Sequence, residues 1–422
     1  MLAAVAPTAA LKMAAPLHPS LDSTAPRIQP PAEAVQLSQR ARGLHPSLTL
    51  AIAAKARQLK ADGQDICSLS AGEPDFDTPA FIRQAAAQAL EAGHTRYGPA
   101  AGESALREAI AGKLSCENGV PTSLGQVLVT NGGKQALFNL FQVLLDPGDE
   151  VLLPAPYWLS YPEIARLAGA SVTVLPCEAT AGFRLDPQQL EQAISPATRL
   201  LVLNSPGNPT GIVISRGELE QLAAVLRRHP RVAVVCDEIY EYLLAPGLVH
   251  HSLAAVAPDL AERIFIVNGF AKGWAMTGWR VGWLAGAEPV IRAASALQSQ
   301  STSNVCSFAQ FGALAALEGP RDCVQTMAAE FNRRRRLLSE GLRRLPGVTL
   351  PQPQGAFYAF PDVSACGLDS MTLCDRLLDR VGLAVVPGVA FGDDRCIRLS
   401  CAASPAAIED GLQRLERFFA GL

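Results

Sequence analysis

Apolar residues along the middle of the chain follow two alternating patterns. Short, continuous apolar runs are typical of strands that are buried on both faces of a sheet. Longer segments between them, such as 134–145 and 217–229, have apolar residues at the spacing of an amphipathic helix. This alternation predicts an α/β fold over 77–315, with a mostly parallel sheet covered by helices. The apolar runs lie at 126–130, 149–154, 171–176, 199–204, 231–240 and 263–270.

The segments on either side of this region have a different pattern. Residues 34–76 contain two helical stretches and a short strand, and 316–422 mix helices with strand-like runs such as 396–402. We expect these two segments to pack together as a smaller α+β domain. The basic run Arg333–Arg336 lies in a long predicted helix, and we interpret it as solvated helix surface rather than a nucleic-acid site.

The first 33 residues are rich in Ala and Pro and poor in charge. Their prolines exclude a long helix and therefore a membrane span, and they lack the basic start and unbroken apolar stretch of a secretory signal. A plastid transit peptide would be rich in arginine, but Arg27 is the only arginine here. We interpret 1–33 as a disordered extension.

Composition narrows the classes of function. The 422 residues include 36 basic and 39 acidic ones, for a net charge of −3. This balance gives no reason to expect nucleic acid or an acidic membrane as a partner. None of the ten cysteines forms a CxxC pair or has zinc-finger spacing. We therefore expect no metal site, and we expect mostly buried thiols in the reducing environment of the cytoplasm.

Candidate chemistry gathers after the predicted strands. Ligands of open α/β sheets bind at the carboxyl ends of the strands, and polar or glycine-rich segments follow these strands here. Because such ends lie at one edge of a sheet, we expect these segments to share a site. They are Gly132–Lys134, Tyr157–Trp158, Asn208, Asp237 with Tyr240, and Lys272.

Two basic residues lie in the segment NGFAKGWAMTGWRVG, at 268–282. The apolar neighbours of Lys272 would desolvate its amine and lower its pKa, and a neutral amine is a nucleophile that can form a Schiff base. Alternatively, Lys272 is a surface lysine whose stem lies on apolar surface. Arg280 could hold a phosphate with its planar fork, or form an ion pair at a domain interface.

The other candidates also have two interpretations each. The carboxylate of Asp237, at the end of a buried strand, needs a cationic partner or several donors, unless it caps a helix. The two-glycine turn before Lys134 offers backbone N–H groups at a helix N-terminus to an anion. Trp158 could stack on a flat ring or pack in the core. The prolines and glycines of NSPGNPTG would fix the direction of the Asn208 amide.

A lysine nucleophile, an acid for a ring nitrogen, a stacking tryptophan and a phosphate cradle are what pyridoxal phosphate requires of a protein. The segments NSPGNPTG, CDEIY and AKGWAMTGWRVGW have the order and spacing of fold-type I pyridoxal-phosphate aminotransferases of class I, which the sequence resembles over 34–422. AGEPDFDTP, PYWLSYPE and IRLSCA resemble the bacterial and plastid aspartate aminotransferase subgroup, some members of which also transaminate prephenate. The resemblance implies a seven-stranded sheet and transamination between L-aspartate and 2-oxoglutarate.

The resemblance assigns a role to each matching residue. Lys272 matches the Schiff-base lysine, which also moves the proton of the substrate α-carbon. Asp237 matches the acid that keeps the pyridine nitrogen protonated. Tyr240 and Asn208 match the partners of the ring hydroxyl, and Trp158 matches the stacking aromatic; Asn208 and Trp158 are also expected at the substrate. The phosphate site is matched by Gly133, Lys134 and Arg280.

Substrate and subunit contacts follow from the same resemblance. Arg398 matches the arginine that holds the α-carboxylate, with Gly72 beside it. Lys134 is implicated in holding the distal carboxylate, assisted by Thr49. A lone lysine is a point charge and discriminates less sharply than an arginine fork, which makes broader dicarboxylate use plausible. Tyr97 matches a tyrosine that reaches the phosphate of the neighbouring subunit, which implies a homodimer.

The chain departs from the family pattern at three positions. Gly269 and Ala271 stand where relatives often have serine, which implies fewer hydroxyl donors to the phosphate. Cys401 stands where a tyrosine is common. Other functions remain open: an aminotransferase for alanine or aromatic amino acids, a lyase on the same fold, a cofactor-binding regulator, or a protein that retains only the fold.

Overall fold

The computed structural model describes residues 36–44 and 46–421. These belong to two units, 1–43 and 44–422. The described part of the first unit contains the short helix α1 (Gln39–Arg42), which begins where the Ser38 hydroxyl accepts a hydrogen bond from the backbone of Ala41. The extension predicted for 1–33 lies outside the described residues. The remaining description concerns the second unit.

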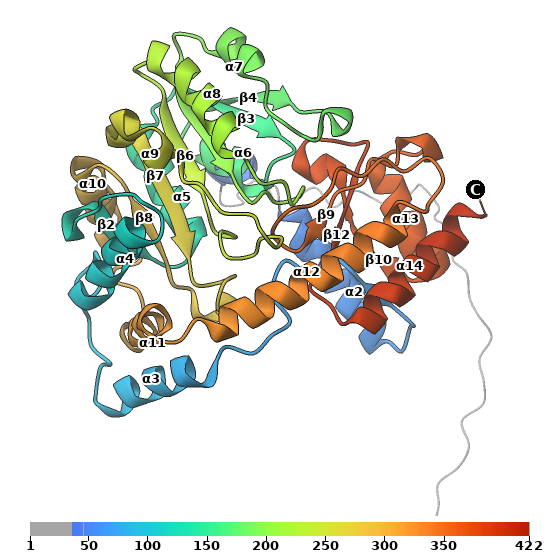
Figure 1. The fold of residues 1–422 in the computed structure, drawn as a ribbon, viewed down its shortest axis with the longest axis horizontal. Coiled ribbons are helices and arrows are strands. Elements are labelled where there is room, and N and C mark those ends of the chain that lie inside the picture. Colours follow the sequence, from blue (N-terminus) through green and yellow to red (C-terminus); the bar gives the residue numbers. More distant parts are fainter. Residues whose placement is uncertain (1–35, 45, 422) are drawn as a thin grey trace, which may run out of the picture. The chain divides into compact units, whose positions relative to one another are not determined.

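A mostly parallel sheet forms the centre of the second unit, as the sequence predicts, and it has the seven strands that the family resemblance implies (Figure 1). All neighbouring strands are parallel except for β8, which is antiparallel to both β2 and β7. The apolar runs of the sequence form six of these strands, but β8 was not predicted. In spatial order the strands are β2 (Val127–Thr130), β8 (Gly282–Ala285), β7 (Ile264–Gly269), β6 (Ala233–Asp237), β5 (Thr198–Asn204), β3 (Glu150–Ala155) and β4 (Ser171–Pro176).

The sheet is buried on both faces because successive side chains of a strand point to opposite sides. In β5, Leu200 and Val202 belong to one apolar core, whereas Leu201 and Leu203 belong to the other. The first core contains residues of α5 (Gly133–Leu144), α6 (Ser160–Leu167) and α10 (Glu288–Ser301). The second contains residues of α3 (Ala80–Glu91), α4 (Ser104–Cys116), α8 (Arg216–Arg228), α9 (Leu253–Val256) and α11 (Ser307–Glu318), and α7 (Pro187–Ala193) packs on α8.

Two small sheets lie beside the large one. Strand β1 (Cys67–Ser68) pairs in parallel with β10 (Leu383–Ala384). Strand β12 (Ile397–Ser400) is antiparallel to β11 (Val386–Pro387) and β9 (Tyr358–Ala359). The helices near them are α2 (Leu48–Ala61), α12 (Asp322–Leu342), α13 (Ser370–Val381) and α14 (Pro405–Phe419).

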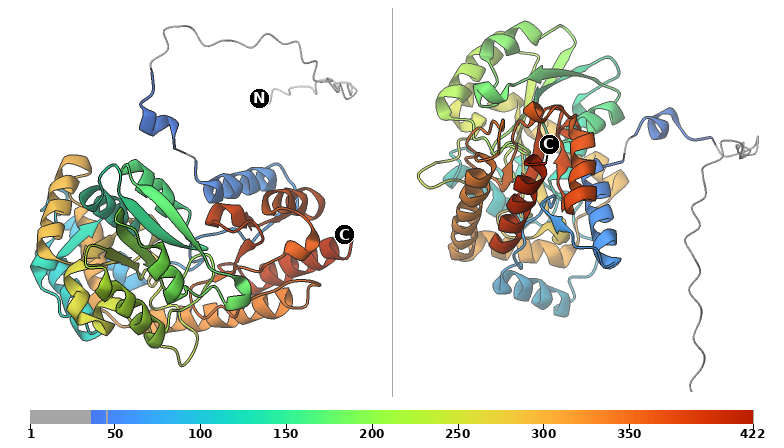
Figure 2. Two further views of the ribbon diagram at one scale, coloured as in Figure 1. Left: turned by 90° about the horizontal axis from the view of Figure 1, so that it is seen from above. Right: turned by 90° about the vertical axis from the view of Figure 1, so that its right-hand side faces the viewer.

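Helix α2 packs with the C-terminal part of the chain. Its Ala56 shares an apolar cluster with Leu378 and Ala384, and Figure 2 shows α2 alongside the last helices. Chain segments that are far apart in the sequence are thus side by side. The domain limits at 76/77 and 315/316 stay a prediction, since 44–422 form one compact unit. Among the described residues, no helix is both long enough and apolar enough to cross a membrane.

The prediction of a fully solvated Arg333–Arg336 run is wrong for its two middle residues. Arg334 and Arg335 are only 7% and 1% exposed. Arg334 forms an ion pair with Asp75 at 2.7 Å, and Arg335 donates to the backbone oxygen of Ala356 at 2.7 Å. Four consecutive residues point in all directions around a helix, and α12 is packed against neighbouring elements. Part of the run must therefore face the protein interior.

Candidate active site

A cavity of about 1020 Å³ opens at the carboxyl ends of β5 and β6. It brings together all the predicted site residues except Tyr97. The side chain of Tyr97 is outside this cavity and 93% exposed, so its predicted contact with a neighbouring subunit stays a prediction. The predicted residues that line the cavity are Thr49, Gly72, Gly133, Lys134, Trp158, Asn208, Asp237, Tyr240, Lys272, Arg280 and Arg398.

Lys272 follows β7 and directs its amine into the cavity. Its Nζ donates a hydrogen bond to the backbone oxygen of Gly72, and it lies 5.8 Å from the ring centre of Tyr240. Burial lowers the pKa of Lys272 to about 8; the charge of Glu73 opposes this shift, whereas Arg398 adds to it. About a tenth of the amine is therefore neutral at pH 7, far more than for an ordinary lysine, and the neutral form is the one that nucleophilic and proton-transfer chemistry requires.

Asp237 ends β6 with its carboxylate buried. The Tyr161 hydroxyl donates to its Oδ2 at 2.8 Å, and the Ile239 backbone N–H donates to its Oδ1 at 3.3 Å. Because a turn rather than a helix follows Asp237, the helix-cap interpretation does not apply. Burial raises the pKa of Asp237 to about 6, and these two hydrogen bonds oppose the rise. The carboxylate is thus ionised at neutral pH and suited to hold a protonated ring nitrogen.

Arg398 enters the cavity from β12 and is only 2% exposed. It donates to Oδ1 of Asn208 at 3.1 Å and to the backbone oxygen of Ser70 at 3.0 Å. Its Nε has no hydrogen-bond partner among the described residues. A buried guanidinium without a carboxylate partner is a binding site for the carboxylate of a ligand.

The NSPGNPTG segment is fastened to the strand beside it. Asn204 donates to the backbone oxygen of Asp237 at 2.9 Å, and its Oδ1 accepts from the backbone N–H of Asn208 at 2.8 Å. Since Arg398 occupies Oδ1 of Asn208, the amide NH₂ of Asn208 remains to donate to a ligand oxygen. Tyr240, whose hydroxyl lies 3.0 Å from that of Tyr358, borders the same part of the cavity.

The N-terminus of α5 forms an anion cradle together with two cations. Gly132 has φ 79°, and a Cβ atom there would lie 2.6 Å from Nη2 of Arg280, so the turn requires glycine. Lys134 lies 5.0 Å above the ring centre of Trp158, and its pKa is lowered by burial and by Arg280. Among the described residues, no carboxylate pairs with either cation. Two cations beside a helix N-terminus fit the phosphate of pyridoxal phosphate.

Several residues at the site escaped the sequence analysis. Tyr161 holds Asp237, Tyr358 contacts Tyr240, and Asn204 fastens the Asn208 turn. A weak signal existed for Tyr161 alone, since it lies one helical turn after Trp158 in PYWLSYPE. Together with the cradle, the buried acid and the partly neutral lysine, these residues meet each requirement of pyridoxal phosphate.

The three departures from the family pattern have different positions. A Cβ atom on Gly269 would lie 2.9 Å from the Cα of Gly282, so the close approach of β7 and β8 requires glycine there. Ala271 lines the cavity without offering a hydroxyl donor. Cys401 is fully buried, with its Sγ 3.9 Å from the backbone oxygen of Phe331, and it does not line the cavity.

Comparisons with known proteins agree with this geometry. The family model "Aminotransferase class I and II" matches residues 64–415. The aspartate/prephenate aminotransferase of Cereibacter sphaeroides is 43% identical over 92% of this chain and 99% of its own length. The bifunctional aspartate and glutamate/aspartate-prephenate aminotransferase of Petunia hybrida is 44% identical over 91% of this chain and 82% of its own. A structure of Thermus thermophilus aspartate aminotransferase with maleate has a TM-score of 0.87 and 45% identity, covering 90% of this chain and 99% of that one.

Proposed function

The chain belongs to the class I and II aminotransferases, and we propose that it transfers the amino group of L-aspartate to 2-oxoglutarate, yielding oxaloacetate and L-glutamate. We further propose prephenate as an amino-group acceptor, because relatives from Cereibacter and Petunia have prephenate in their names. The observation that carries the proposal is the presence of two cations, Arg398 and Lys134, in the cavity that contains Lys272. Two cations suit a substrate with two carboxylates.

Pyridoxal phosphate is the cofactor of this family, and when bound it supplies an aldehyde that takes up an amino group and a ring that accepts electrons from the α-carbon. In our proposal Lys272 holds the cofactor and moves the proton of the substrate α-carbon. Asp237 holds the proton on the ring nitrogen, while Asn208 and Tyr240 donate to the ring hydroxyl. Trp158 orients the ring by stacking, so that binding at several points sets the geometry for proton transfer.

The two ends of the substrate would be bound by different cations. Arg398, with Gly72 beside it, would hold the α-carboxylate by two parallel hydrogen bonds. Lys134 would hold the distal carboxylate, with Thr49 nearby on α2. The lysine ammonium imposes less directional demand than a guanidinium, which supports use of both aspartate and the bulkier prephenate. The maleate in the Thermus structure is likewise a dicarboxylate, which supports this assignment.

We also propose a homodimer with shared active sites. The exposed side chain of Tyr97 supports this proposal, because a residue that completes the partner's phosphate site must project from its own subunit. A reducing compartment such as the cytoplasm is supported by the ten cysteines, all of which are free thiols.

Purified protein with Lys134→Ala tests the substrate assignment. We expect its KM for L-aspartate to rise about 10- to 100-fold, as loss of a charged hydrogen bond worth ~1.5–3 kcal/mol implies. The KM values for L-alanine and L-phenylalanine, which lack a distal carboxylate, should rise much less. Lys55→Ala is the matched control, because Lys55 lies on α2 outside the cavity and 3.9 Å from Asp375.

Cofactor affinity is measured in parallel, since Lys134 also lies beside the proposed phosphate site. An unchanged KM for aspartate in Lys134→Ala would show that the distal carboxylate is bound elsewhere. Faster transamination of alanine or phenylalanine than of aspartate by the parent protein would replace the proposed substrate.

A further inference from the structure

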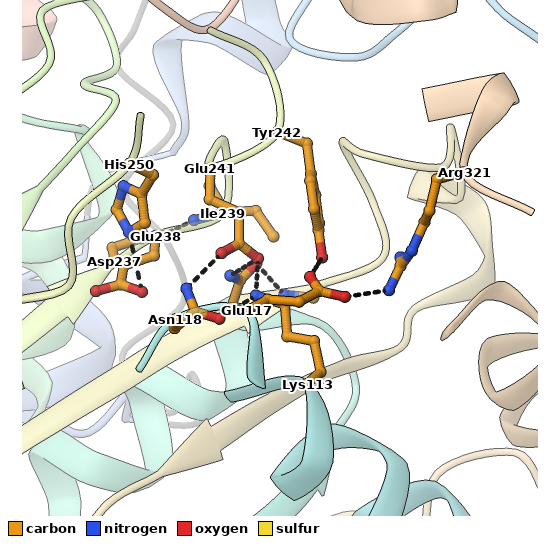
Figure 3. Close-up of polar contacts among 12 residues, drawn as sticks. Lys113, Glu117, Asn118, Asp237, Glu238, Ile239, Glu241, Tyr242, His250 and Arg321 are labelled. Atoms are coloured by element: carbon orange, nitrogen blue, oxygen red, sulfur yellow. Dashed lines mark hydrogen bonds and ion pairs between the residues drawn. The ribbon is translucent and has the colours of Figure 1, made fainter. Parts of the chain in front are cut away.

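A second cluster of charged side chains adjoins the cavity but does not line it (Figure 3). The segment 237–242 separates the two sites. Asp237 and Tyr240 line the cavity, whereas Glu238 and Glu241 contact residues outside it. The turn is compact, since Glu241 donates its backbone N–H to the oxygen of Glu238. Glu238 is the chain neighbour of Asp237, and its charge acts on the carboxylate of Asp237.

Glu241 is fully satisfied within this cluster. It forms an ion pair with Lys113, and their side chains are 5% and 2% exposed. Asn268 donates to the same oxygen of Glu241 at 2.8 Å, and Asn118 donates to the other at 2.8 Å. A buried carboxylate needs such partners, and Glu241 has a cation and two amide donors. The direct ion pair and hydrogen bonds of Glu241 are thus made without His250, whose charge only adds to that of Lys113.

Among the described residues, His250 is the only cation that forms an ion pair with Glu238. The Nε2 of His250 lies 3.1 Å from Oε2 of Glu238, and their side chains are 8% and 3% exposed. Neither ring nitrogen of His250 nor Oε2 of Glu238 has a hydrogen bond of good geometry among the described residues, so the contact between them is an ion pair. Burial by itself lowers the pKa of His250, but the charges of Glu238 and Glu241 outweigh that effect and the opposing charge of Lys113, and they raise it. The contact with Glu238 therefore favours the imidazolium form of His250.

These acidic residues and His250 are close enough to suggest a metal site, because their ligand atoms lie within 4.8 Å of one another. The contacts of Glu241 argue for ion pairs instead. Both of its oxygens are already hydrogen-bonded, and the ammonium of Lys113 occupies the position beside them. A divalent cation would have to displace Lys113 or bind next to it, at a large electrostatic cost.

We propose that His250 is a positioning residue for the cofactor site: it holds Glu238 away from the cavity and cancels its charge, so that Asp237 keeps its own negative charge for the ring nitrogen. The inference rests on the proposed role of Asp237. Two adjacent carboxylates repel each other's ionised forms, and Glu238 is the acidic group whose charge acts on Asp237. Three other groups around the Asp237 carboxylate lower its pKa instead: the Tyr161 hydroxyl, the Ile239 N–H and the charge of Lys272. Without His250, Asp237 would bind its proton more tightly.

The test is the pH dependence of pyridoxal phosphate binding to the apoprotein, followed by tryptophan fluorescence. In the parent protein, affinity should fall as the pH drops through the range in which Asp237 takes up a proton. In His250→Gln, we expect the midpoint of that fall to move up by roughly one pH unit, as an unpaired neighbouring charge implies. At the parent's midpoint the affinity of the variant should then be roughly fivefold weaker than that of the parent, approaching about tenfold at lower pH.

The double variant Glu238→Gln/His250→Gln distinguishes charge from packing. It removes both charges while keeping similar shapes, so the midpoint should return to within a few tenths of a pH unit of the parent. Glu238→Gln alone should lower the midpoint or leave it in place, and it remains informative if His250→Gln does not fold. His251→Gln is the matched control, because His251 is the next residue and has no polar contact within the described structure.

An unchanged midpoint in His250→Gln would overturn the proposal, as would a double variant that keeps the full shift. The readout is cofactor binding rather than turnover. Failure of the aspartate assay would therefore leave this experiment interpretable, and failure here would leave the proposed reaction untouched.

Discussion

The segment 237–242 separates the cations of the cavity from those of the charged cluster. The two groups differ in whether a carboxylate lies beside each cation. Lys113 and His250, in the cluster, each lie beside a buried carboxylate. Four cations of the cavity have no carboxylate within ion-pair distance among the described residues: Lys134, Lys272, Arg280 and Arg398. Lysine thus occurs in two electrostatic states, paired in the cluster and unpaired in the cavity.

This difference distinguishes structural charges from ligand-binding charges. A buried ion pair contributes little net stability, but breaking it leaves a costly unpaired charge. An unpaired cation in a cavity already carries that cost in the free protein, and an anionic ligand relieves it on binding. The cluster should therefore respond to mutation with lost stability, and the cavity with lost binding and activity.

The largest effect is expected at Lys272. Lys272→Ala should lower the rate of aspartate transamination by more than about 1,000-fold, the order found when a nucleophile is removed from an enzyme. The free energy of unfolding should change little, because no carboxylate loses its ion-pair partner. Turnover measurements and urea unfolding check the two parts. Activity close to that of the parent would contradict the assignment of Lys272.

The same substitution in the two regions gives the sharpest test of the comparison. Lys113→Met leaves Glu241 buried without its cation, and it should destabilise the apoprotein by ~3–5 kcal/mol. Lys134→Met removes an unpaired, partly desolvated cation and should cost less than about 1 kcal/mol. Urea unfolding of both apoproteins gives the values. Equal losses of stability in the two variants would show that the distinction between paired and unpaired cations is wrong.

Inorganic phosphate should stabilise the apoprotein against thermal unfolding only by binding in the cavity. At 100 times its dissociation constant, an anion bound in the cradle of α5, Lys134 and Arg280 stabilises the apoprotein by about 2.7 kcal/mol. Arg280→Met should remove most of this protection, whereas Arg227→Met, at the exposed ion pair with Asp259, should retain it. Thermal unfolding with and without phosphate measures the difference. Full protection of Arg280→Met would place the anion elsewhere.

The smallest effect concerns pH and the cluster. Because the pKa of His250 is raised in the folded protein, its pairing with Glu238 stabilises the protein fully below the ordinary histidine value of 6.5. This contribution is lost as the pH rises through the raised pKa, with a slope of at most about 1.4 kcal/mol per pH unit. Glu238→Gln should show a flatter stability profile above pH 6.5 in urea unfolding. A profile identical to that of the parent would contradict the pairing.

Much of the fold could be predicted because local pattern determines it. Continuous apolar runs identified the parallel strands, since both faces of these strands are covered. Strand β8 (Gly282–Ala285) escaped because its first two residues belong to the AKGWAMTGWRVGW motif and it has only four residues. The burial of Arg334 and Arg335 also escaped, because it depends on what packs against α12 rather than on the composition of the helix.

The residues of the candidate site could be predicted where each lies in a short motif directly after a predicted strand. The positions of Asn208, Asp237 and Lys272 follow from the strand ends that precede them. Contacts between distant segments gave no local signal: Tyr161 reaches Asp237 across 76 residues, and Arg398 reaches Asn208 across 190. The pairing of His250 with Glu238 was also unpredictable, because nothing in the sequence around a single histidine indicates which carboxylate it will contact.

The central claim is that the unpaired cations and the buried acid of the cavity bind pyridoxal phosphate and present it to a dicarboxylic amino acid. The most direct measurement is the absorption spectrum of the purified protein, saturated with pyridoxal phosphate, before and after addition of L-aspartate without any 2-oxo acid. We expect a visible band from the bound cofactor, which aspartate abolishes and later addition of 2-oxoglutarate restores. A visible band that aspartate leaves unchanged would contradict the substrate, and a protein that pyridoxal phosphate cannot colour would contradict the claim as a whole.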